Sequence, residues 1–436
     1  MTAIKKFKNH HSKMKSRSKP FFRLIYILNV ICQLFGVAPI LDSSRHKRRA
    51  LRCVHYIWCS ILVLYIYLVN SYYLLSLIRA PLVTIVKVFF VYEFINNPFI
   101  VSLIAFTICY YAEQYRIIPL ELLSIYKNYK RLQSKVIADK DFFGVLHKEV
   151  NLMLAVFCPI VICCFILDYI RMDCGFIYYI LNTSVFNLSN VLITLNLCQY
   201  LVSLRFVYQM YRGLNEVLKG RLNKVGSMTL DTYEDTANDI YISGFSWFHR
   251  EFYSSCCGGG NKFKILKSLS RPYFDLDRIM AKLTKVFGII LLFNFLGSLL
   301  SLAVECFAVY KFFDNANILG DTLLDVHNRF LWLLIHVGRI LLILIANHAI
   351  IEEKCRTIFI INELHITSKE MERAINRFLL RLMVHQPVEM ACGAVDLDLL
   401  VLSGIAGAMA NYIIFLIQTD VGRLTMERSQ NITIAS

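Results

Sequence analysis

Long, uninterrupted apolar runs are the feature that most constrains this sequence. Several approach or exceed the ~20 residues that a helix needs to cross a bilayer, in a chain of 436 residues that is 57% hydrophobic. The runs are continuous rather than alternating, and they are too long for the strands of a membrane barrel. We therefore predict an all-α polytopic membrane protein. The seven predicted spans are residues 53–77, 88–112, 151–170, 176–204, 285–310, 330–351 and 398–418.

Basic residues give these spans a direction. The net charge of +16 is distributed between the apolar runs, not gathered in one patch, which argues against nucleic acid as a partner. Residues 1–52 hold thirteen Lys and Arg against one acid, Asp42, and every second connection after them is again rich in Lys and Arg. By the positive-inside rule the N-terminus is cytosolic, and seven spans then place the short tail 419–436 outside the cell. This topology is the inverse of that of a G-protein-coupled receptor, so the sequence argues against that class.

The segments between the spans define the remaining organisation. Residues 21–41 are apolar but have basic clusters on both flanks, so we predict a helix in the inner membrane interface rather than an eighth span. Residues 53–351 are predicted to form a bundle of six spans with cytosolic helical connections at 113–150 and 205–284, and 352–397 is a further cytosolic helical segment. A flexible loop is expected at 226–270, which contains a Cys-Cys-Gly-Gly-Gly run at 256–260.

The last span, 398–418, differs from the other six. Gly404, Ala408, Asn411, Phe415 and Gln418 fall on one face at steps of three or four, whereas its other faces carry Leu, Ile, Val and Met. A stripe of small and amide side chains must face protein or water, because lipid offers an amide no hydrogen-bond partner. It could be an interface between packed helices or the lining of a water-filled pore.

The same helix resembles a known family. The run from Asn411-Tyr412 through five apolar residues to Gln418 is similar to the signature of insect gustatory receptors, which is Thr-Tyr, five apolar residues and Gln-Phe. Asn411 stands where the family has Thr, and Thr419 stands where it has Phe. The run at 391–393, the Asp396 and Asp398-Leu399 positions and the pair at 407–408 also fit the family's pattern, as do the chain length and the inverted topology.

The resemblance implies a taste receptor that is a ligand-gated, non-selective cation channel in the plasma membrane of chemosensory neuron dendrites. It implies a homo- or heterotetramer with other gustatory receptor subunits, in which each subunit gives its last span to a central pore. Gly404, Ala408, Asn411, Phe415, Gln418 and Thr419 would line or gate this pore. Asp396 and Asp398 would form a ring of carboxylates at its cytosolic mouth, although carboxylates there also complement a helix N-terminus.

A ligand pocket is expected in the outer halves of spans two to six, because ionisable groups within a membrane are usually functional. The polar and aromatic candidates are Tyr92, Asn96, Asp168, Tyr169, Tyr178, Asn182, Glu305, Trp332, His336 and Arg339. Trp332, His336 and Arg339 follow steps of four and three and therefore share one face of span six. The alternative for Arg339 is a structural ion pair with Glu305 or Asp168.

Catalysis has little support in the sequence. It has no nucleophile elbow, phosphate loop or HExxH motif, and its fourteen cysteines lack metal-ligand spacing. We therefore predict a non-enzymatic protein without cofactor or metal, whose partners are a small-molecule tastant, permeating cations and membrane lipid. Two alternatives from other classes are a secondary transporter and a seven-helix receptor coupled to a partner protein.

Overall fold

The computed structural model describes residues 19–39, 45–79, 84–133, 142–172, 187–239, 247–314, 323–363, 369–384, 390–391 and 395–435. Within these ranges the chain is helical apart from short turns and one antiparallel pair of two-residue strands. The helices are α2 (Lys19–Leu34), α3 (Arg45–Arg79), α4 (Thr84–Tyr110), α5 (Ala112–Gln133), α6 (Phe142–Met172), α8 (Ser189–Asp239), α9 (Trp247–Asp314), α10 (Leu323–Asn362), α11 (Lys369–Val384) and α12 (Val401–Ala435). The strands are β1 (Met390–Ala391) and β2 (Val395–Asp396).

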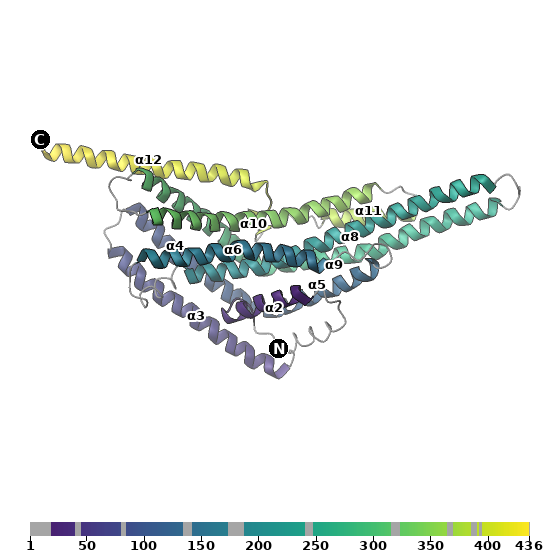
Figure 1. The fold of residues 1–436 in the computed structure, drawn as a ribbon, viewed down its shortest axis with the longest axis horizontal. Helices are drawn as coiled ribbons and strands as arrows, with labels where there is room; N and C mark the ends of the chain where they lie inside the picture. The colour runs from purple at the N-terminus through teal and green to yellow at the C-terminus, as the bar shows by residue number, and fades with distance from the viewer. Residues whose placement is uncertain are drawn as a thin grey trace.

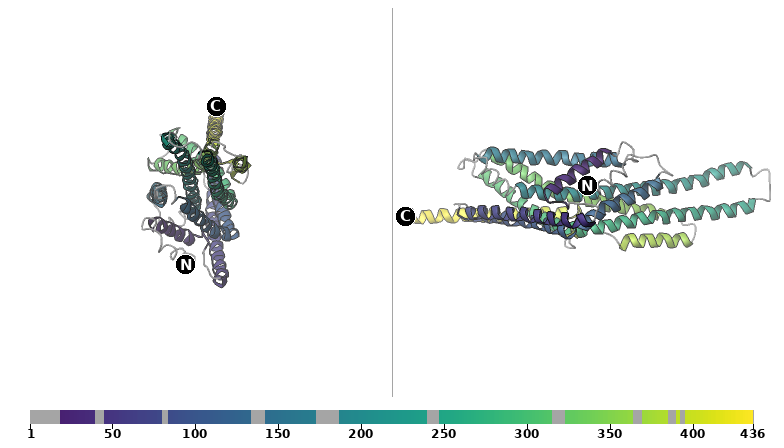
Figure 2. Two further views of the ribbon diagram at one scale, coloured as in Figure 1. Left: turned by 90° about the vertical axis from the view of Figure 1, so that its right-hand side faces the viewer. Right: turned by 90° about the horizontal axis from the view of Figure 1, so that it is seen from below.

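The helices form one elongated bundle (Figure 1). The ends of α8 and α9 extend together beyond the other helices at one end, and the C-terminal end of α12 extends at the opposite end. Two further views show that α12 lies along one side of the bundle (Figure 2). The all-α prediction is confirmed.

Six of the described helices are long and apolar enough to cross a membrane, and a seventh candidate is broken. The broken one consists of α4 and α5, which meet at an angle of 70°. The bend falls at Tyr111, where the predicted second span, 88–112, ends. The structure therefore agrees with the predicted count of spans, provided that α4 and α5 are counted as one.

Long helices replace several of the connections expected from the sequence. Helix α8 continues from the membrane-spanning segment to Asp239, and α9 begins at Trp247, so the described parts of the expected loop 226–270 are helical. Each glycine in a helix costs about 1 kcal/mol relative to alanine, but adding a residue to an existing helix is far easier than nucleating one. The Gly-rich run at 256–260 is therefore carried within α9. Helix α12 likewise continues to Ala435, through the residues predicted as a tail.

Two other boundaries differ from the prediction. The fourth span was expected at 176–204, whereas α8 begins at Ser189 and residues 173–186 lie outside the described ranges. The expected interfacial helix at 21–41 is α2, which ends at Leu34 and is followed by a turn in which Gly36 has a φ of +69°. Phe21 of α2 is buried 5.5 Å from the ring of Phe143 on α6, measured between centroids. Whether α2 lies in the interface stays a prediction.

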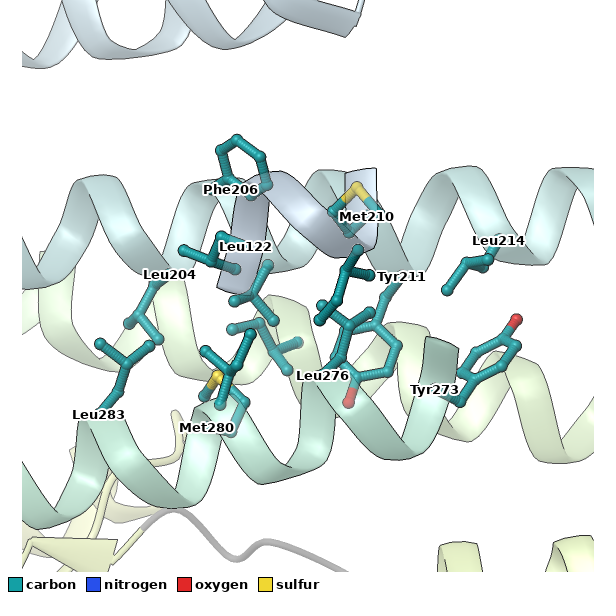
Figure 3. Close-up of a cluster of buried hydrophobic side chains, with 14 of the residues drawn as sticks. Leu122, Leu204, Phe206, Met210, Tyr211, Leu214, Tyr273, Leu276, Met280 and Leu283 are labelled. Atoms are coloured by element: carbon teal, nitrogen blue, oxygen red, sulfur yellow. The ribbon is translucent and has the colours of Figure 1, made fainter. Parts of the chain in front are cut away.

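The largest hydrophobic core joins α5, α6, α8, α9, α10 and α11. Figure 3 shows its centre, where leucine, methionine and tyrosine side chains of α8 and α9 meet Leu122 of α5. In the most apolar windows of α8 and α9, 61% of the residues are buried, against 6% in α12. Helices α8 and α9 are thus central to the subunit, and α12 is peripheral.

A buried polar network crosses this core. The Asn215 side chain of α8, 1% exposed, donates from Nδ2 to Glu353 Oε2 and to the Glu353 carbonyl, both at 2.8 Å. Its Oδ1 accepts from Tyr273 Oη at 2.6 Å and from Thr357 Oγ1 at 2.8 Å. These four bonds use the full capacity of the amide and connect α8 with α9 and α10.

Candidate functional site

Helix α12 has one buried face and one wide exposed face. Leu416 is buried against Phe307 of α9, and Leu402 and Ile405 pack against a cluster that contains Leu344 of α10. The stripe of small and amide side chains identified in the sequence lies on the exposed face of α12. All six predicted pore residues are exposed in the single subunit; they are Gly404, Ala408, Asn411, Phe415, Gln418 and Thr419.

Phe415 shows how little the subunit covers this stripe, because its side chain is 60% exposed. A Cβ atom added at Gly404 or Gly407 would meet nothing within 4 Å. The glycines therefore do not serve helix packing within the subunit. What the stripe faces must lie outside the subunit, and in a bilayer that can be lipid, water or another protein chain.

The start of α12 is attached to α10. Asp398 Oδ1 lies 2.6 Å from Nδ1 of His348, and the same oxygen accepts the backbone N–H of Leu399 at 2.6 Å. The Asp398 carboxylate thus contacts both a side chain of α10 and the backbone just before α12. Asp396 lies in β2, where its Cα is paired with that of Met390 in β1. Of the two predicted mouth residues, Asp398 already has two partners for its carboxylate within the subunit.

At the other end of the bundle, Asp168 of α6 is held by two amides. Nδ2 of Asn187 donates to Asp168 Oδ2 at 2.8 Å, and Nδ2 of Asn328 donates to Oδ1 at 2.7 Å. Asp168 is 9% exposed, and both asparagines are 2% exposed. This cluster joins α6, the residues just before α8, and α10.

Arg339 of α10 is buried at 2% exposure and reaches α8. Its guanidinium donates to Oδ1 of Asn190 at 3.0 Å, to the Asn190 carbonyl at 2.9 Å and to Oγ1 of Thr194 at 2.7 Å. The alternative of an ion pair with Glu305 or Asp168 is wrong. Glu305 pairs instead with Arg329, at 3.4 Å, and the described acceptors of Arg339 are all on α8.

The other pocket candidates fall in different places. The ring centroids of Trp332 and His336 are 6.3 Å apart, and His336 is buried at 6% exposure. Asn96 is directed at α9, with Nδ2 2.6 Å from where a Cβ on Gly297 would lie. Tyr169 is 52% exposed. Tyr92 is half-buried on α4, while Tyr178 and Asn182 lie outside the described residues.

The structure thus brings Asp168 to the face of α10 that carries Trp332, His336 and Arg339. It also adds five residues that the sequence analysis did not select, which are Asn187, Asn190, Thr194, Asn328 and His348. A signal for three of them was available. Asn187, Asn190 and Thr194 follow helical steps of three and four in an apolar segment, the pattern that identified the stripe on α12.

A comparison with known families identifies this arrangement. A model described as 7tm chemosensory receptor matches residues 25–422. The chain belongs to the 7tm chemosensory receptor family. This match extends from α2 through α12, well beyond the short motif at the last helix from which the resemblance to insect gustatory receptors was inferred.

Relatives in Drosophila melanogaster confirm that resemblance. The chain is 28% identical over 410 residues to a protein named gustatory receptor 59e, covering 92% of this chain and 95% of the relative. It is 29% identical over 160 residues to gustatory receptor for sugar taste 43a, covering 36% of each chain. The first match spans both proteins nearly end to end, so the two share their organisation.

Solved structures of chemosensory receptors have the same fold. The insect olfactory receptor OR5 from Machilis hrabei in complex with eugenol superimposes with a TM-score of 0.62 at 11% sequence identity, covering 92% of this chain and 99% of that one. A second structure of the same receptor superimposes with a TM-score of 0.53 at 12% sequence identity, covering 91% of this chain and 98% of that one. At this identity the likeness concerns the fold alone.

Proposed function

We propose that this chain is a subunit of a taste receptor that works as a ligand-gated, non-selective cation channel. The observation that carries the proposal is the exposed stripe on α12. An apolar helix that leaves Asn411 and Gln418 exposed places amides where lipid cannot satisfy them, whereas a water-filled axis shared with other subunits can.

The proposed assembly is a tetramer, homomeric or formed with other gustatory receptor subunits, in which α12 of each subunit borders the axis. The peripheral position of α12 and the open space at Gly404 and Gly407 support close approach of a second chain. Phe415, 60% exposed, would form a hydrophobic ring that closes the pore by excluding water. Gln418 and Thr419 would lie at the end of the pore that we predict to be outside.

The contact between His348 and Asp398 would transmit the ligand signal. Helix α10 carries Trp332, His336 and Arg339 toward one end and His348 nearer the other, so a shift of α10 on ligand binding would move the start of α12 through Asp398. Asp396 would supply negative charge near the pore mouth. We place the receptor in the plasma membrane of chemosensory neurons, with permeating cations, lipid and a small-molecule stimulus as its partners.

Recording current from cells that express the chain tests the proposal. A channel gives fast, stimulus-evoked conductance, and Gln418→Ala then changes cation selectivity or block at an unchanged surface level. Ser403→Ala, on α12 but outside the proposed lining, is the matched control. Permeation that is the same in the Gln418 variant and the wild type removes Gln418 from the pore.

The two alternatives give different results in the same cells. Concentrative uptake of a substrate without conductance indicates a secondary transporter. A response that requires a partner protein and persists without conductance through the chain indicates a coupled receptor. Either result contradicts the proposed channel.

A further inference from the structure

Asp168 is a buried carboxylate that lacks a cation. Its two described hydrogen bonds come from neutral amides, and it makes no ion pair with any residue that the structure describes. Removing an ionised carboxylate from water is expensive unless it is paired. A neutral amide donor offsets only part of that cost.

Among the described residues, no basic side chain forms an ion pair with Asp168, and Arg329, next to Asn328, pairs with Glu305 instead. The first turn of α8 follows Asn187 directly and contributes the partial positive charge of a helix N-terminus, about half a unit. The Arg339 guanidinium is too far away. Asn328, which touches Asp168, precedes Arg339 by eleven residues of α10, or ~16 Å along the helix axis, and Arg339 is bound to α8.

The same cluster contains hydrogen-bond acceptors that lack donors. Oδ1 of Asn187 and Oδ1 of Asn328 are both buried and have no partner among the described residues. Their amide orientation is fixed, because the NH2 groups must face the carboxylate of Asp168. The cluster therefore presents one negative charge and two unfilled acceptors, and what it lacks is a positively charged donor.

An aromatic ring lies one helical turn along α10. Trp332 follows Asn328 by four residues, so the two share a face of the helix, and Trp332 is only partly buried. An indole face attracts a cation, and it also accommodates an apolar group attached to one. This combination suits a molecule with an ammonium group and an apolar body.

We propose that Asp168, with Asn187, Asn328 and Trp332, forms a binding site for a protonated organic amine. The ammonium group donates to Asp168 and to an amide oxygen, and its apolar body lies against Trp332. This inference rests on the proposed function for the claim that binding opens a channel, but binding itself does not require one. It assigns the stimulus to the class of cationic amines.

The test uses three probes that share one skeleton and differ in charge: 2-phenylethylamine, 2-phenylethanol and phenylacetic acid. At neutral pH these are a cation, a neutral alcohol and an anion. Binding is measured on the purified full-length protein in detergent, as ligand-dependent thermal stabilisation. The amine should bind more tightly than the alcohol, and the acid should bind most weakly.

Asp168→Asn removes the charge and keeps the shape of the side chain. We expect it to weaken amine binding about 10- to 100-fold, since a hydrogen bond to a charged group contributes about 1.5–3 kcal/mol, and to leave alcohol binding nearly unchanged. Asp275→Asn, which removes a partly buried carboxylate of α9 that pairs with Arg278, is the control and should change neither. Trp332→Leu should weaken binding of the amine about fivefold. It provides an independent variant if Asp168→Asn does not fold.

Three results would overturn the proposal. They are equal binding of amine and alcohol, strongest binding of the acid, and failure of all three probes to bind at millimolar concentration. Recording current in parallel separates the two proposals. Amine binding without current contradicts the proposed channel but supports the amine site. Current evoked by another stimulus, without amine binding, supports the channel and contradicts the amine site.

Discussion

Replacing Asn215 with leucine tests whether the network across α8, α9 and α10 holds the subunit together. Leucine has the same branching and the same number of side-chain heavy atoms as asparagine, but no polar atoms. The variant therefore removes all four hydrogen bonds of the amide without opening a large cavity. The groups that lose a partner stay buried, because Tyr273 and Thr357 are 0% exposed and Glu353 is 7% exposed.

The expected cost follows from which groups keep another partner. The Thr357 hydroxyl can turn its proton to the Glu353 carbonyl, which lies 3.0 Å from Oγ1, so the cost at Thr357 is small. Tyr273 Oη loses its 2.6 Å acceptor and keeps only the neighbouring Thr357 hydroxyl, and Glu353 keeps Arg356 at 3.3 Å on Oε1 only. A buried group left unsatisfied costs about 1–3 kcal/mol, and more for a charged one. The two groups together give a loss of about 3–6 kcal/mol.

This loss should be visible as reduced thermal stability of the protein in detergent. For a chain of 436 residues, an unfolding entropy of ~2.1 cal/mol/K per residue gives ~1 °C per kcal/mol, so the unfolding midpoint falls by about 3–6 °C. Asn376→Leu, on an exposed position of α11, is the control and should change stability by less than about 0.5 kcal/mol. If Asn215→Leu costs no more than this control, the network does not stabilise the subunit and the reasoning is refuted.

Two further predictions concern close contacts. Gly213→Ala should destabilise the bundle by about 1–2 kcal/mol in thermal unfolding, because its Cβ would lie 2.6 Å from Oη of the buried Tyr129. The control Gly422→Ala, with open space around the added Cβ, should be neutral or slightly stabilising. Equal effects of the two substitutions on stability would contradict the close contact at Gly213. Asp398→Ala should raise the EC50 of an effective stimulus about fivefold at an unchanged surface level, since the contact with the 41%-exposed side chain of His348 is worth about 1 kcal/mol. An unchanged EC50 would show that this contact does not link α10 to α12.

The local sequence pattern was sufficient to predict the helices and to distinguish α12 from the other spans. Continuous apolar runs predict spanning helices, because the bilayer requires every backbone group to be bonded within its own helix. The face of a helix repeats every 3.6 residues, so the stripe from Gly404 to Gln418 could be read without knowing what it faces. The motif at Asn411 and Gln418 indicated the family that the match over 25–422 then established.

Continuity of the helices was less predictable. The expected loop at 226–270 was inferred from its irregular pattern and its Cys-Cys-Gly-Gly-Gly run. In the structure, helix extends from the bundle into that segment from both sides, as α8 and α9. Propagation from a packed helix outweighs the propensity of a few residues, and that packing is not visible in a local stretch of sequence.

The sequence by itself determined that Asp168, Arg339 and Asp398 need partners, since a charged group at membrane depth cannot be left to lipid. Only the tertiary structure decided which partners they have. Asp168 meets asparagines 19 and 160 residues away, and Asp398 meets His348 across 50 residues. Many polar side chains could satisfy a given carboxylate, and the one that does is set by the depth and rotation at which the helices pack. That packing left Asp168 between two amides and without an ion pair to any described residue, which is why a site for a ligand is inferred there.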